Sequence, residues 1–79
     1  MTKVSNLAVT RDSATTYLTG TLSVGTTLAK QIVDGAYENT QFRNGDNSVY
    51  FAWVSDMIGA ANALSYFQYL QLSHLRNTA

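Results

Sequence analysis

Histidine, cysteine and carboxylate side chains are the groups most able to do chemistry, and this sequence holds few of them. Cysteine does not occur in its 79 residues, and His74 is the single histidine. A disulfide, a thiolate ligand set and a histidine-rich zinc site are therefore excluded. His74 follows a long apolar run, where its positive form would suit the C-terminal end of a helix. We expect no metal and no cofactor, and we interpret His74 as structural.

Oxygen-bearing side chains gather at two places. Asp34 and Glu38 are four residues apart, and Lys30 precedes Asp34 by the same interval. This spacing is typical of a solvated charge row on one face of a helix. Residues 44–48 (Asn-Gly-Asp-Asn-Ser) are rich in oxygen, but they lack the acidic spacing and terminal glutamate of a calcium loop. A hairpin turn explains them better.

Phosphate binding and catalysis find equally little support. Residues 24–27 (Val-Gly-Thr-Thr) precede Lys30, but the several glycines of a phosphate-binding loop are missing. We interpret this segment as a strand end followed by a helix cap. Because no acid, base and nucleophile come together, we predict that the protein is not an enzyme.

The charge balance bears on the choice of partner. Charged residues make up 13% of the chain and the formal net charge is zero, so a basic surface for nucleic acid is missing. No run of residues is apolar enough to suggest a secretory leader or a membrane span. We expect a soluble, cytoplasmic protein, in the host cytoplasm if a phage encodes it. Its partner would be another protein or a second copy of itself.

The pattern of the first half predicts two strands and one helix within a single domain, 1–79. Residues 4–10 are predicted as a strand with Leu7 and Val9 on one face. Residues 17–24 alternate apolar and mostly hydroxyl side chains, as half-buried strands do, and a turn is predicted at 11–14. A helix is predicted over 28–38, capped by a threonine after Gly25.

The Asn44-Gly45 pair is the strongest local signal in the second half. Asn-Gly favours a two-residue hairpin turn, which would pair strands on both sides across 40–54. A competing interpretation starts a long helix at Ser48, capped by Asp46 or Ser48. Such a helix would protrude from a domain whose radius of gyration is about 12 Å, so we prefer the strand, followed by a helix over 56–76.

These elements predict an α+β fold with the order ββαββα. The two hairpins form a small antiparallel β-sheet, and the two helices cover one of its faces. A second exposed surface would then lie on the opposite face of the sheet, at Tyr17, Thr19, Thr21, Tyr50 and Val54.

The predicted last helix carries more apolar and tyrosine surface than a small interior hides. Tyrosine with serine, asparagine and arginine is a mixture that binding surfaces favour. The predicted partner-binding residues on this helix are Ile58, Asn62, Tyr66, Tyr69, Ser73 and Arg76.

The sequence therefore predicts a non-enzymatic protein–protein interaction module that binds and occludes a partner surface. Small chains of this kind, without cysteine or a reactive site, are common among phage inhibitors of host defence, anti-CRISPR proteins included; the analogy is one of class only. Such a module would act as a single chain or as a homodimer. The alternatives are a self-assembling structural subunit of a particle or filament, and a small-ligand carrier or enzyme with a pocket between sheet and helices at Trp53, Phe51 and Tyr37.

Overall fold

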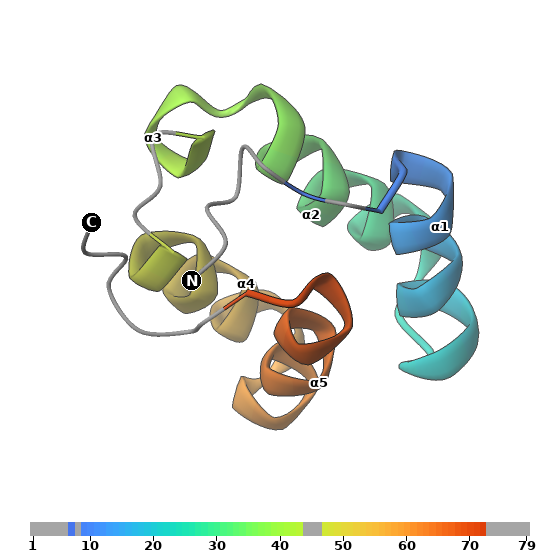
Figure 1. The fold of residues 1–79 in the computed structure, drawn as a ribbon. Coiled ribbons are helices and arrows are strands. Elements are labelled where there is room, and N and C mark those ends of the chain that lie inside the picture. Colours follow the sequence, from blue (N-terminus) through green and yellow to red (C-terminus); the bar gives the residue numbers. More distant parts are fainter. Residues whose placement is uncertain (1–6, 8, 44–46, 73–79) are drawn as a thin grey trace.

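The fold is built from helices, and it differs from the predicted one (Figure 1). The computed structural model describes residues 7, 9–43 and 47–72. That part of the chain contains no strand, so the predicted α+β class and the order ββαββα are wrong. The elements in chain order are α1 (Arg11–Thr16), the π-helical η2 (Tyr17–Thr21), α2 (Thr26–Glu38), α3 (Thr40–Arg43), α4 (Asn47–Ile58) and α5 (Ala60–Leu70).

The predicted strand 17–24 is instead the continuation of a helix. Thr10 caps α1, because its hydroxyl oxygen accepts a hydrogen bond from the Ser13 amide at 3.1 Å. The predicted turn is thus the first turn of α1. Ala14 and Leu18 are both buried, four residues apart on one helix face. Apolar residues at this spacing fit a helical repeat as well as an alternating strand, and the Thr10 cap favours the helix.

Threonine-rich sequence is tolerated in this helix because its hydroxyls bond to the preceding turn. Thr15 donates to the Arg11 carbonyl at 2.8 Å, and Thr19 donates to the Thr15 carbonyl at 3.0 Å. The predicted strand 4–10 lies mostly outside the described residues. Its two apolar residues that are described do not form a strand, and they pack against the core.

The predicted hairpin 40–54 is also wrong on both sides of its turn, while 44–46 themselves lie outside the described residues. On the first side the chain forms α3. The Asn39 side-chain oxygen begins this short helix by accepting from the amides of Gln41 and Phe42, at 3.0 and 3.3 Å. On the second side the chain forms α4.

Helical spacing is clear in α4 once its buried residues are known. Asn47, Tyr50 and Val54 are all fully buried, at intervals of three and four residues. The competing interpretation, a helix starting at Ser48, was therefore nearer to the structure, since α4 starts at Asn47.

Gly59 divides the predicted last helix, 56–76, into two. Its φ of 89° and ψ of 154° are backbone angles that only glycine adopts readily. The helix α4 ends before it and α5 begins after it, and α4 packs more extensively on α5 than on any other described helix. The break keeps the described chain within a radius of gyration of 11.0 Å, so no long helix protrudes.

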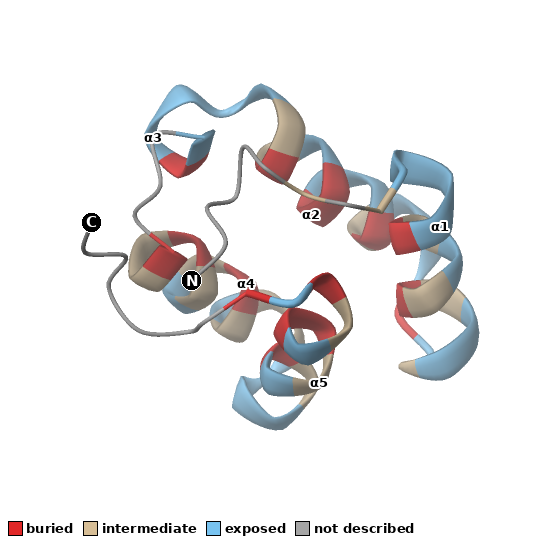
Figure 2. Cartoon of the chain, viewed as in Figure 1, coloured by how far each residue is buried: buried red, intermediate tan, exposed pale blue. Residues whose placement is uncertain are grey.

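The helix predicted over 28–38 is confirmed as α2. It starts slightly earlier, with Gly25 at the cap position. One face of α2 is buried against the other helices, as Figure 2 shows. The buried side chains on this face are Ala29, Ile32, Val33 and Ala36.

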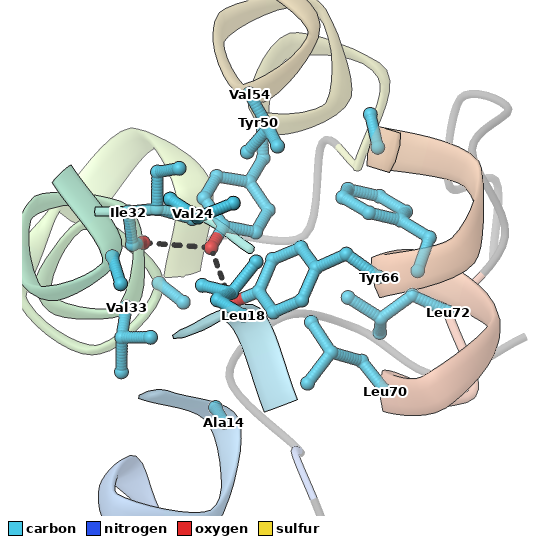
Figure 3. Packing of buried hydrophobic residues seen from close by; sticks show 14 of the residues in the cluster. Ala14, Leu18, Val24, Ile32, Val33, Tyr50, Val54, Tyr66, Leu70 and Leu72 are labelled. Carbon is cyan, nitrogen blue, oxygen red and sulfur yellow. Dashed lines mark hydrogen bonds between the residues drawn. The ribbon is translucent and has the colours of Figure 1, made fainter. Parts of the chain in front are cut away.

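Two tyrosine hydroxyls meet in the middle of the core (Figure 3). Tyr50 and Tyr66 are each 0% exposed, and their hydroxyl oxygens are 3.0 Å apart. The Tyr50 hydroxyl donates to the Ile32 carbonyl at 2.7 Å. Since a carbonyl only accepts and Tyr50 has one proton, Tyr66 must donate to Tyr50. This chain of hydrogen bonds joins α5 to α4 and α4 to α2.

Candidate functional site

The predicted partner-binding residues of the last helix are used largely within the fold. Tyr66 is buried, so its ring is not available to a partner in this structure. Tyr69 is partly buried and stacks on Tyr17, with ring centroids 4.2 Å apart and planes at 10°. Ile58 is partly buried against the core, and its carbonyl accepts a hydrogen bond from the Asn62 amide group at 3.0 Å. The last two predicted residues, Ser73 and Arg76, lie outside the described residues.

The second predicted surface does not exist as a face, because there is no sheet in the described residues. Tyr50 and Val54 are fully buried, Tyr17 and Thr19 are partly buried, and Thr21 is exposed. His74 lies outside the described residues.

The pocket predicted at Trp53, Phe51 and Tyr37 does not assemble either. The Phe51 ring meets Phe67 of α5 at 5.1 Å, and the Tyr37 hydroxyl donates to the Val9 carbonyl. Trp53 instead lines a different hollow in the surface.

That hollow is a groove of about 710 Å³ bounded by α2, α3 and α4, whose positions Figure 1 shows. We call it the Trp53 groove. Its apolar side chains are aromatic or thioether, and its polar side chains are carboxylates and amides. The lining residues are Gln31, Asp34, Gly35, Glu38, Asn39, Phe42, Trp53 and Met57.

Gly35 shapes this groove by letting an indole ring lie on the backbone of α2. A Cβ atom at this position would lie 2.8 Å from Trp53 Cζ3, which is closer than real Cβ contacts come. The Trp53 ring also packs on Phe42, with centroids 5.3 Å apart, and on Tyr50, at 6.1 Å. Glycine weakens a helix interior by about 1 kcal/mol relative to alanine, and here that loss permits the indole contact.

Two carboxylates give the groove its charge. Arg11 reaches across from α1, and its Nη1 lies 3.2 Å from Asp34 and 2.9 Å from Glu38. Both carboxylate side chains stay more than half exposed, at 54% and 62%. The guanidinium of Arg11 also lies 4.9 Å from the centre of the Tyr37 ring. Asp34 and Glu38 therefore share one arginine, although the sequence predicted Lys30 as their neighbour.

A second, smaller hollow of about 470 Å³ lies beside the Tyr17–Tyr69 stack. It is lined by hydroxyls and one carboxylate from α1 and η2, with both tyrosine rings at its edge. The Tyr17 hydroxyl donates to the Ser65 carbonyl at 3.3 Å. The two stacked rings therefore hold η2 against α5. The Trp53 groove is the larger hollow and the more apolar of the two.

Sequence reasoning missed the Trp53 groove because it placed Trp53 and Phe42 in strands. The one available signal was Gly35, a glycine inside an otherwise regular amphipathic helix. Such a residue often has a packing reason.

Among the residues that the structure describes, no three histidine or acidic side chains lie close enough to hold a metal ion. In the same residues, no helix has both the length and the apolar character needed to cross a bilayer. Comparison of the chain with protein-family models, with curated proteins and with solved structures gives no match.

Replacing Gly35 with alanine tests the packing that forms the groove. The added Cβ must displace the Trp53 ring, and overpacking of this kind typically costs about 1–3 kcal/mol, against a gain in helix propensity of about 1 kcal/mol. We expect Gly35→Ala to be no more stable than the parent chain and to shift the emission of Trp53, the single tryptophan. Denaturant unfolding followed by tryptophan fluorescence measures both effects.

The matched control is Gly20→Ala in η2, where an added Cβ meets nothing within 4 Å. That variant should be at least as stable as the parent and should leave the emission unchanged. A Gly35→Ala protein that gains stability to the same extent, with unaltered emission, would show that the indole does not rest on α2.

Proposed function

We propose that this chain is a protein-binding module whose contact surface is the Trp53 groove. The observation that supports the proposal is the composition of the groove: Trp53, Phe42 and Met57 form its apolar part, and side chains of α2 form a polar rim. Tryptophan, other aromatic residues and methionine are enriched where proteins meet, inside a rim that stays polar. The groove thus combines an apolar centre with groups that can fix a partner's orientation.

Binding at this groove would act by covering part of the partner. The described residues form a small unit, about 33 Å along its longest dimension. A partner segment seated between α2 and α4 would be withheld from its other ligands. Covering a partner surface in this way would need no catalysis, and it keeps the inhibitor role expected from the sequence as a proposal.

A rim variant that narrows the groove tests this function. Gln31 is exposed and lines the groove, so Gln31→Arg adds length and positive charge there without touching the core. A tagged chain is used to isolate partners from the native host, and the purified partner is then titrated with each variant. We expect Gln31→Arg to weaken binding by about tenfold or more, the effect of losing one strong interface contact.

Gln68→Arg is the matched control, because Gln68 is an equally exposed glutamine on α5 and does not line the groove. It should bind like the parent chain. If both variants bind equally well, or both fail equally, the contact surface is not the Trp53 groove.

Self-assembly is a second candidate, favoured by one observation on α5. Leu64 is 38% exposed, more than the other large hydrophobic side chains that the structure describes. Ala60 and Ala61 are exposed in the first turn of the same helix. Copies of the chain could associate there. Light scattering on dilute protein separates the candidates, since a structural subunit forms large assemblies and a binding module does not.

A further inference from the structure

The carboxylates at the Trp53 groove already hold one guanidinium group, which lies beside the Tyr37 ring. Arg11 sits there, paired with Asp34 and Glu38 and placed over the Tyr37 ring. One arginine against two carboxylates leaves one negative charge in excess. No lysine or arginine is among the described residues that line the groove.

Helix geometry puts a second aromatic ring on the other side of the same carboxylates. Tyr37 follows Asp34 by three residues, and Glu38 follows Gly35 by three, so these positions are neighbours around α2. The Trp53 ring rests on Gly35. The carboxylate pair therefore lies between two aromatic side chains, and within the described residues the cation that contacts the pair, Arg11, is on the Tyr37 side.

We propose that the Trp53 groove accepts an arginine side chain from a segment of the protein partner, held between the Trp53 ring and the carboxylates of Asp34 and Glu38. This inference rests on the proposed function and names the chemistry of its partner. Arginine suits the place better than lysine for two reasons. Its planar guanidinium stacks on an aromatic face, and its five N–H groups can donate to two carboxylates at once. The exposed Gln31 amide oxygen at the rim offers another acceptor.

The test uses three short peptides with free access to the groove, acetyl-Gly-Arg-Gly-amide and its lysine and citrulline counterparts. Citrulline keeps the shape of arginine without its charge. Emission of Trp53 reports occupancy directly, because the chain has no other tryptophan. We expect saturable change with the arginine peptide, weaker binding of the lysine peptide, and no saturation with the citrulline peptide.

Two variants make the test specific. The double variant Asp34→Asn/Glu38→Gln should bind the arginine peptide about fivefold more weakly, as expected for exposed ion pairs. Arg11→Gln should bind it about threefold more tightly, because a competing positive charge is removed. Circular dichroism confirms that each variant is folded. If Arg11 only stabilised the fold, Arg11→Gln would not increase the affinity for the arginine peptide.

Equal binding of the arginine and citrulline peptides would overturn the inference, and so would unchanged binding by the double variant. Equal binding of the lysine and arginine peptides would also overturn it in favour of a general cation site. The peptide experiments can contradict this inference without contradicting the proposed function. If Gln31→Arg abolishes binding of the natural partner while the peptides show no dependence on charge, the groove is the contact surface and arginine is not its ligand.

Discussion

Raising the pH above about 10 is expected to destabilise this protein progressively, because two of its tyrosines resist ionisation inside the core. Burial raises the pKa of the Tyr50 hydroxyl well above its usual value, and the nearby Tyr66 raises it further. Burial also raises the pKa of Tyr66, partly offset by its hydrogen bond to Tyr50. The unfolded chain has ordinary tyrosines that titrate near pH 10. Above that pH the unfolded state therefore releases protons that the folded state keeps.

The sign and size of the effect follow from proton linkage. Stability falls with pH wherever the unfolded state binds fewer protons than the folded state, by about 1.4 kcal/mol per pH unit for each such group. Two groups give a slope of about 2.7 kcal/mol per pH unit from pH 10 upward, up to the folded-state pKa values. A chain of this length is expected to be stable by about 4–12 kcal/mol. A chain at the lower end of this range should therefore unfold about two pH units above 10, and a more stable chain should lose about 5 kcal/mol over the same interval.

Urea unfolding followed by circular dichroism, at pH 8, 10 and above, measures this slope. The matched control is the double variant Tyr50→Phe/Tyr66→Phe, which has the same rings and no buried hydroxyl. Its stability should fall much less steeply over the same range. Parallel pH profiles for the parent and the double variant would mean that these hydroxyls ionise as readily in the folded chain as in the unfolded one.

Tyr50→Phe is expected to cost about 1–3 kcal/mol of stability, the penalty for a buried donor without an acceptor. The variant loses the oxygen to which Tyr66 donates, and Tyr66 is fully buried. The Ile32 carbonyl loses the hydrogen bond from Tyr50, but it keeps its backbone hydrogen bond within α2. Tyr66→Phe should cost less, about 1 kcal/mol, because Tyr50 still donates to Ile32.

The two substitutions should not be additive. Adding Tyr66→Phe to Tyr50→Phe removes the stranded hydroxyl, so the double variant should be more stable than Tyr50→Phe alone. Replacing both partners of a buried hydrogen bond by apolar groups of the same shape is nearly neutral. Urea unfolding at pH 7 of the four proteins in this cycle measures the coupling. If the stability loss of the double variant equals the sum of the two single losses, the hydrogen bond in which Tyr66 donates and Tyr50 accepts is contradicted.

Sequence reasoning found α2 because local and tertiary signals agree there. Its apolar residues follow a helical repeat, and a glycine precedes them at the cap. The segment 17–24 shows the opposite case. Threonine and leucine at even spacing suit a strand, but Thr10 caps a helix, and the hydroxyls of Thr15 and Thr19 bond back to the preceding turn. The Thr10 cap and the burial of Leu18 with the rest of the core together favour the helix.

The hairpin predicted in the second half of the chain was wrong for a related reason. Val49, Phe51 and Trp53 alternate in sequence, and all three are partly buried, yet in the helix they face different neighbours. Tyr50, which the alternation assigned to solvent, is among the most buried residues.

The candidate site was harder to predict than the fold, because it depends on contacts between distant helices. Tyr66 looks like surface in the sequence, and it is buried because Tyr50 and Ile32 give its hydroxyl a place in a hydrogen-bond chain. The Trp53 groove needs Gly35 from α2 and Trp53 from α4 to meet. The ion pairs of Arg11 join residues 23 and 27 positions apart. No local pattern contains these pairings.

Fluorine NMR on the chain carrying fluorotryptophan at Trp53 tests the central claim most directly. The label is unique, since the sequence has one tryptophan, and it stays visible whatever aromatic residues the partner has. On titration with the purified natural partner, the account predicts that the Trp53 resonance shifts and saturates together with binding measured by sedimentation. A resonance that stays in place while sedimentation shows the complex would mean that the partner binds elsewhere on the surface.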